Sequence, residues 1–218
     1  MKTLTIDVVS DVVCPWCYVG KRKLERALAL LAVQHPEVDP VVNWHTFQLN
    51  PDMPPEGMSR ADYVFNKFGD QAATVYDRVK DVGQALGLPF AFDRITRQPN
   101  TVVAHSLIAA SEPGLAQDQM VEALFKGYFM EGRDLTEASE LMDIAESAGM
   151  SRELAQQHLQ NSDLHSQTID SDKAAREIGI TGVPFFIFNR QVGVSGAQDS
   201  DTLLQAMQEA MNAAADEA

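Results

Sequence analysis

Apolar residues follow one another almost without interruption from Leu4 to Val13, and this run predicts a buried strand. The next segment places leucines on one helical face, from Leu24 to Leu31, and Pro36 ends the pattern. Residues 40–47 alternate and are rich in strand-forming residues, which predicts a second strand. A strand, a helix and a strand in this order predict a parallel βαβ unit with a right-handed crossover.

The middle of the chain, from Ser59 to about Gly179, shows helical periods and predicts no strand. Glycine and proline residues interrupt these periods, so we expect a bundle of about five to seven helices. The end of the chain returns to strands. Phe185–Phe188 and Val192–Val194 predict a hairpin across a turn at Asn189-Arg190, and Ser200–Ala214 predicts a closing amphipathic helix.

This order of elements predicts an α/β protein with a thioredoxin fold that a large all-helical insertion interrupts. We expect a discontinuous thioredoxin-like domain over residues 1–58 and 180–218, and a helical insertion domain over residues 59–179. The total length of 218 residues suits a core domain of this kind with one sizeable insertion. The alanine-rich tail, Ala213–Ala218, is expected to fray.

Both cysteines of the chain lie in Cys14-Pro15-Trp16-Cys17, where the first strand passes into the first helix. Pro15 suits the first turn of a helix, and cysteines at i and i+3 lie close enough to form a disulfide. The helix N-terminus favours a thiolate on Cys14, so we expect this residue to be the nucleophile. Cys17, one turn inside, should be more buried and should resolve the mixed disulfide. A CxxC in a βαβ setting is a redox signature.

The alternative to redox chemistry is half of a zinc site, but structural zinc normally takes four cysteine or histidine ligands in recognisable pairs. The chain has no second cysteine pair, and its histidines show no short ligand spacing: His35, His45, His105, His158 and His165. We therefore expect no metal. No organic cofactor is needed either, because two thiols carry both electrons of a disulfide exchange.

The composition limits which binding partners and which cellular compartment are expected. A net charge of −14 argues against nucleic acid or an anionic membrane as a partner. No apolar run approaches the roughly 20 residues that a membrane span needs. The sequence from Met1 to Asp7 lacks the apolar core and cleavage site of a signal peptide. We therefore expect a cytoplasmic protein, in which the two cysteines are reduced much of the time.

Two motifs near the chain ends carry a family resemblance. Cys14–Cys17 after a strand, with Thr181-Gly182-Val183-Pro184-Phe185 before another, resembles the DsbA-like branch of the thioredoxin superfamily. Three longer segments resemble its FrnE-like subgroup of cytoplasmic thiol–disulfide oxidoreductases or isomerases: Ser10–Gly20, Phe47–Pro51 and Asn100–His105. The resemblance runs through essentially the whole chain.

The resemblance implies a docking element for substrates. Pro184 would be a cis-proline that faces the CxxC motif, and the backbone of Val183 would pair with a substrate polypeptide strand. Polypeptide or small-molecule disulfides are the substrates that it implies. It leaves open whether the protein is a monomer or a homodimer.

The same resemblance raises a competing function. Kappa-class glutathione transferases and 2-hydroxychromene-2-carboxylate isomerases share this architecture, but a serine typically stands where this chain has Cys14. Those enzymes need no resolving thiol, so Cys17 favours dithiol exchange, with glutathione still possible as a co-substrate. A third alternative is a non-catalytic binding or chaperone-like module with a vestigial CxxC.

Five further residues are candidates for the site. Trp16 lies between the cysteines, where its ring could contact substrate or tune the redox potential. Asp11 could assist proton transfer at the resolving cysteine, or could be only a hydrogen-bonded residue at the strand end. His45 on the second strand and His105 on a helix could each approach the dithiol. Asn100 shares the family-like segment with His105 and could line the same cleft.

Overall fold

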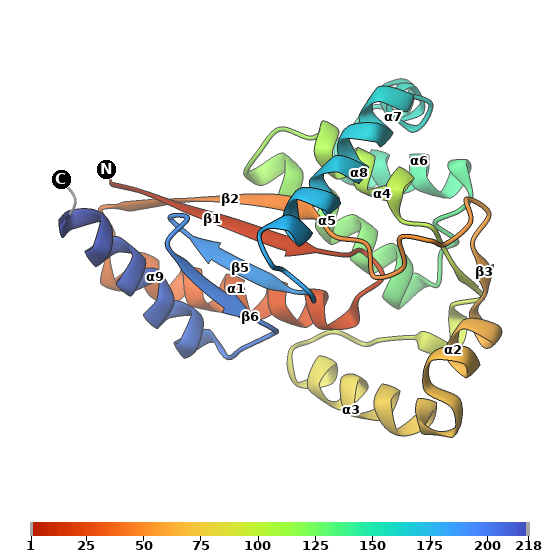
Figure 1. Ribbon diagram of the computed structural model, residues 1–218, viewed down its shortest axis with the longest axis horizontal. Helices are drawn as coiled ribbons and strands as arrows, with labels where there is room; N and C mark the ends of the chain where they lie inside the picture. The colour runs from red at the N-terminus through yellow and green to blue at the C-terminus, as the bar shows by residue number, and fades with distance from the viewer. Residues whose placement is uncertain (1, 217–218) are drawn as a thin grey trace.

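The computed structural model describes residues 2–216, and a mixed four-stranded sheet forms its core (Figure 1). The sheet contains β1 (Lys2–Ser10), β2 (Val38–Thr46), β5 (Phe185–Phe188) and β6 (Val192–Ser195), in the order β2-β1-β5-β6. β1 pairs with β2 in parallel, and β5 is antiparallel to both β1 and β6. The predicted βαβ unit and hairpin are both present, and the α/β thioredoxin fold is confirmed.

The predicted first strand was too long. β1 ends at Ser10, because the Cys14 N–H donates to the Asp11 carbonyl at 3.0 Å and turns the chain into α1 (Pro15–Gln34). α1 ends before Pro36, as predicted. Along β1, Leu4, Ile6 and Val8 alternate with partly exposed residues.

Two helices that pack together, α1 and α9 (Ser200–Asp216), cover one face of the sheet (Figure 1), and the main core extends from there into the helical region. On the other face, α8 (Ser162–Glu177) lies against β2, and a smaller apolar cluster joins Val9, Phe47, Ala175 and Ile180. α9 continues to Asp216, so the helix extends into the expected tail, residues 213–218. Residues 217 and 218 of that expected tail lie outside the described residues.

Seven α-helices occupy the described chain between β2 and β5, at the upper end of the predicted number. They are α2 (Arg60–Phe68), α3 (Ala72–Ala85), α4 (Val102–Ala110), α5 (Leu115–Lys126), α6 (Ala138–Ser147), α7 (Arg152–Leu159) and α8. Two 3₁₀ turns, Gly69–Gln71 and Phe92–Arg94, and a π-helical turn, Gly127–Glu131, complete the region. Because α8 packs on both α4 and β2, the exact domain division stays a prediction.

The prediction that this region holds no strand was wrong. β3 (Met58–Ser59) pairs with β4 (Arg97–Gln98) in a small antiparallel ladder. Two residues are too few to show the alternation that marks a strand in a sequence.

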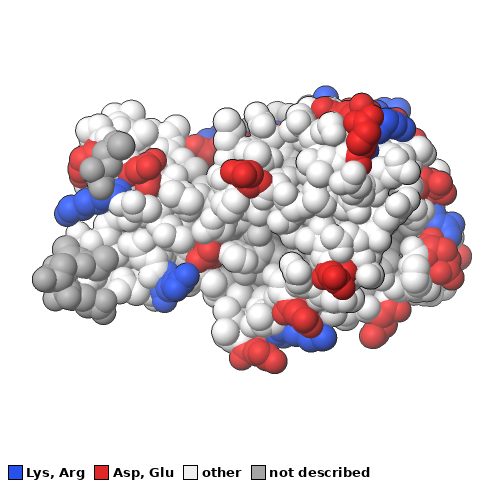
Figure 2. Space-filling model, turned by 90° about the horizontal axis from the view of Figure 1, so that it is seen from above, with Lys and Arg blue, Asp and Glu red and all other residues white. Residues whose placement is uncertain are grey.

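Charged side chains are spread over the face of the molecule that Figure 2 shows. On the face in Figure 2, acidic side chains lie scattered among a few basic ones, and the described residues form no continuous basic area there. Among the described helices, none is long and apolar enough to cross a membrane.

Candidate active site

Cys14 caps the N-terminus of α1 and lies between the helical region and the sheet. Its backbone is extended, with φ −96° and ψ 109°, and Pro15 takes the first helical position. The Cys17 N–H donates to the Cys14 carbonyl at 3.0 Å, so both cysteines belong to one turn. Cys14 thus stands at the positive end of the α1 dipole.

Both cysteines are buried, with 5% of Cys14 and 1% of Cys17 exposed, so Cys17, one turn further along, is the more buried of the two, as expected. Burial, and then the hydrogen bond and charge of Cys14, raise the pKa of the Cys17 thiol well above its usual value. Hydrogen bonds from Ser10 and from the backbone of Asp11 oppose this rise but do not cancel it. Cys17 therefore keeps its proton at neutral pH, and both cysteines are free thiols in this structure.

The Val183–Pro184 segment faces the cysteines from the other end of the chain. The Cys14 sulfur lies 3.7 Å from the Val183 carbonyl oxygen, which can accept a weak hydrogen bond from the thiol. The peptide bond between Val183 and Pro184 is cis, as the resemblance implied. The structure thus brings together two motifs that lie 169 residues apart in the sequence.

Gly20 lies where α1 crosses the Pro184 loop, and the sequence analysis did not select it. A Cβ atom built at Gly20 would lie 2.9 Å from Pro184 Cγ and 3.1 Å from the Phe186 ring. The sequence did contain a signal for this residue. Gly20 lies inside an otherwise leucine- and alanine-rich helix, where glycine lowers helix stability by about 1 kcal/mol relative to alanine, so a packing reason for it could have been expected. The absent side chain allows the loop to approach the helix.

We expect Gly20→Ala to lower the free energy of unfolding by about 1–2 kcal/mol, because overpacking against a rigid proline ring outweighs the gain in helix propensity. Urea unfolding of the reduced protein measures this change. Gly182→Ala is the matched control, because a Cβ there meets nothing within 4 Å. Equal unfolding free energies for the two variants would contradict the close-packing explanation.

Asp11 and His105 form a buried pair beneath the cysteine turn. Their side chains are 0% and 2% exposed, and His105 Nε2 lies 3.3 Å from Asp11 Oδ1. The Leu49 N–H donates to Asp11 Oδ2 at 2.7 Å, and the Val13 N–H reaches Oδ1 at 3.5 Å. Asp11 is therefore a hydrogen-bonded residue at the strand end, and its backbone also contacts Cys17. α4 contributes His105, so the pair links the helical region to the redox turn.

The other two cleft candidates have different partners. His45 Nε2 lies 2.9 Å from Asp7 Oδ1 on the sheet face near α8, with 43% of its side chain exposed, so the structure does not bring it to the dithiol. Asn100 donates to the Met53 carbonyl at 2.6 Å and accepts from the Val102 N–H at 3.0 Å. It therefore ties the start of α4 to a loop.

Trp16 is half-buried and packs against the main apolar cluster rather than standing free. Within the described residues, no group of three or more histidine, cysteine, aspartate or glutamate side chains is arranged to hold a metal ion.

Residues 5–208 match the DsbA-like thioredoxin domain family. The chain belongs to this family. A curated relative, the uncharacterised protein YwbO of Bacillus subtilis (strain 168), is 24% identical over 94% of this chain and 96% of its own length. A solved structure of a probable DsbA oxidoreductase from Streptomyces coelicolor superposes with a TM-score of 0.83 at 27% identity, covering 96% of this chain and 90% of that one.

Two more distant structures share the fold. A 2-hydroxychromene-2-carboxylate isomerase superposes with a TM-score of 0.71 at 16% identity, covering 98% of this chain and 99% of that one. The cytosolic disulfide reductase DsbM from Pseudomonas aeruginosa, solved with glutathione, gives 0.56 at 19% identity, with 98% of each chain covered. A disulfide reductase solved with glutathione and an isomerase thus share this fold.

Proposed function

We propose that this member of the DsbA-like family is a thiol–disulfide oxidoreductase that uses Cys14 as nucleophile and Cys17 as resolving cysteine. The observation that carries the proposal is the pair itself: one cysteine caps a helix N-terminus, and the other is a buried thiol one turn later. A cysteine nucleophile alone would also suit a conjugating enzyme, but a resolving thiol in the same turn suits dithiol exchange.

In the reductive direction, the Cys14 thiolate attacks one sulfur of a substrate disulfide. A Cys14–substrate disulfide forms, and the other substrate sulfur leaves as a thiolate. Cys17 then loses its proton and attacks the Cys14 sulfur. The second substrate thiolate leaves, and the enzyme holds a Cys14–Cys17 disulfide, so two electrons have passed to the substrate. Oxidation of a substrate dithiol is the same sequence in reverse.

The raised pKa of Cys17 makes the resolving step depend on a proton acceptor. The backbone of Asp11 hydrogen-bonds Cys17, and the Asp11 side chain is tied to His105, so we assign to this buried pair the acceptance of that proton. The Val183 backbone, beside Cys14, is proposed to pair with an extended substrate segment. Polypeptide disulfides and small disulfides both suit such a site.

Glutathione is the proposed redox partner. The fold shared with DsbM, which was solved with glutathione, supports this choice at the level of the architecture. A cytoplasmic location, as expected from the sequence, would supply this thiol. A glutathione-dependent isomerase is the second candidate, because the 2-hydroxychromene-2-carboxylate isomerase shares the fold. Cys17 has no role in that chemistry.

Equilibration of the protein against reduced and oxidised glutathione tests the proposal. We expect the Cys14–Cys17 pair to convert fully between dithiol and disulfide, and the midpoint to give the direction of electron flow. A midpoint below the cytosolic glutathione poise, roughly −220 to −320 mV, would indicate a reductant. A pair that never oxidises over the accessible range would rule out dithiol exchange and leave the isomerase or a binding module.

A further inference from the structure

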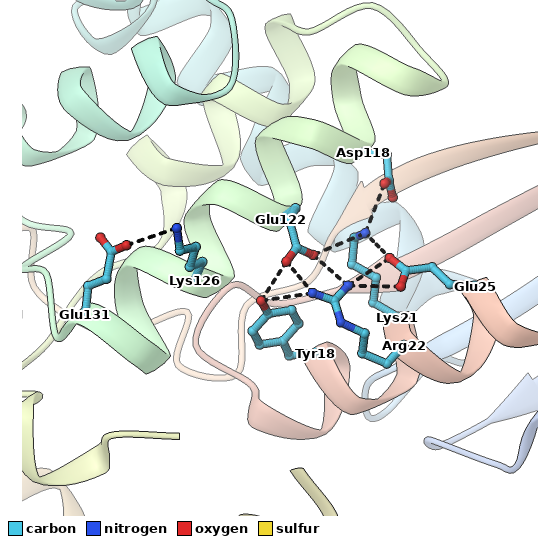
Figure 3. A network of polar contacts seen from close by, with 8 residues as sticks. All are labelled: Tyr18, Lys21, Arg22, Glu25, Asp118, Glu122, Lys126 and Glu131. Atoms are coloured by element: carbon cyan, nitrogen blue, oxygen red, sulfur yellow. Dashed lines mark hydrogen bonds and ion pairs between the residues drawn. The ribbon is translucent and has the colours of Figure 1, made fainter. Parts of the chain in front are cut away.

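A network of charged side chains joins the cysteine-bearing helix α1 to α5 (Figure 3). Lys21 lies seven residues after Cys14, which is about two helical turns, so both lie on the same side of α1. Lys21 Nζ contacts Glu25 at 2.5 Å, and it also contacts Asp118 of α5 at 2.9 Å. The face of α1 that begins with Cys14 is therefore the face that meets the helical region.

Glu122 of α5 contacts three different side chains of α1 (Figure 3). It accepts a hydrogen bond from the Tyr18 hydroxyl at 2.7 Å. Arg22 donates to both of its oxygens, at 2.9 Å to Oε2 and through a second, shorter contact to Oε1. Lys21 Nζ lies 3.3 Å from Oε2. A single carboxylate thus holds two successive turns of the helix.

The Lys21 side chain is only 3% exposed, so its charge depends on these partners. Burial opposes its protonation, but the carboxylates of Asp118 and Glu25 outweigh burial and raise the pKa of Lys21. Burial likewise opposes the ionisation of Glu122, but hydrogen bonds from Arg22 and Tyr18 keep the pKa of Glu122 below its usual value. Lys21 and Glu122 are therefore both charged at neutral pH.

Tyr18 connects this network to the redox turn, because it directly follows Cys17. Its ring stacks on Phe125 of α5 at 4.9 Å, and Phe90 lies 6.1 Å away. Burial and Glu122 raise the pKa of Tyr18, so the hydroxyl remains a donor to Glu122. Arg22 lies over the ring, 5.0 Å from its centre. The side chain next to the resolving cysteine is thus fixed by α5.

We propose that Glu122 is a positioning residue for the dithiol: by holding three side chains of α1, it fixes the first turn of that helix, which carries both cysteines, against α5. The inference rests on the proposed function, because it concerns the reactivity of the same cysteine pair. Glu122 touches neither cysteine and acts through Tyr18 and the helix. A first turn that is less firmly held presents its N–H groups less well to the Cys14 sulfur, which disfavours the reduced, thiolate-bearing form.

Glu122→Gln tests this role, because it removes the charge and keeps a group of the same size. We expect the equilibrium constant with glutathione to change about tenfold toward the oxidised enzyme, which is about 30 mV toward a more negative potential. Alkylation of Cys14 at pH 7 should slow in parallel. Tyr18→Phe, which keeps the stacked ring, should shift both quantities in the same direction. The variant with both substitutions should change each quantity by less than the sum of the two single-variant changes.

Glu131→Gln is the matched control. Glu131 also pairs with basic side chains, Lys126 at 3.5 Å and Arg133 at 2.9 Å, but both partners lie outside α1. It should leave the equilibrium constant and the alkylation rate unchanged. Wild-type values for Glu122→Gln, even with a lowered melting temperature, would show that the network is only structural and would overturn the inference. If that variant does not fold, Tyr18→Phe decides in the same way.

The two hypotheses fail differently in this experiment. A wild-type protein that does not equilibrate with glutathione would refute the proposed function. A wild-type protein that equilibrates normally, with Glu122→Gln indistinguishable from it, would refute only the positioning role.

Discussion

Cys14→Ser should lower the rate of disulfide exchange by roughly 10³-fold or more, because it removes the attacking sulfur and a serine hydroxyl does not ionise near neutral pH. Cys17→Ser should behave differently. It leaves the first attack intact, so the enzyme should accumulate as a mixed disulfide through Cys14. Incubation of each variant with oxidised glutathione, followed by intact-mass measurement, distinguishes a stable adduct of Cys17→Ser from an unmodified Cys14→Ser.

This pair of variants also separates the competing functions. In a conjugating or isomerising enzyme, loss of Cys17 should be nearly silent and no adduct should accumulate. In a binding module, the double variant should keep its cellular role. An adduct on Cys17→Ser that reverses with added thiol supports dithiol exchange alone. Adduct formation on Cys14→Ser instead would reverse the assigned roles, against the burial and the raised pKa of Cys17.

The sequence predicted the passage from strand to helix at the cysteines because three local signals coincide there. An apolar run, a proline suited to a first helical turn and a helical leucine pattern surround the cysteines, and each signal reflects a short-range rule. The contact between Cys14 and Val183 joins segments 169 residues apart, and no local pattern predicts it. The family resemblance supplied that contact.

Features that depend on tertiary packing could not be derived in the same way. The apolar residues of α5 predicted this helix, but Glu122 lies on its polar side. Only the docking of α5 on α1 gives Glu122 a role. The buried pair of Asp11 and His105 is a similar case, because His105 lies within the apolar helix α4, where its partner cannot be inferred from spacing.

His45 is a different case. Its neighbours Trp44 and Thr46 are buried, and the alternation along β2 did indicate that His45 points outward, which the sequence analysis did not use.

The histidines give the second large expected effect. His105→Ala should lower the free energy of unfolding by about 3 kcal/mol, because it opens a cavity and leaves the buried Asp11 carboxylate without one of its donors. His45→Ala, the matched control, should cost less than about 1 kcal/mol, because its pair with Asp7 is partly exposed to solvent. Urea unfolding of the reduced proteins measures both changes.

The same substitution tests whether the buried pair also serves the resolving step. His105→Gln keeps a donor toward Asp11, so it should recover part of the lost stability. If the pair accepts the Cys17 proton, His105→Gln should still resolve mixed disulfides more slowly than the wild type, while the first attack by Cys14 proceeds at its normal rate. Equal resolution rates in the wild type and His105→Gln would limit His105 to holding Asp11 in place. Equal losses of unfolding free energy in His105→Ala and His45→Ala would contradict the argument that burial makes the Asp11–His105 pair the more costly one to lose.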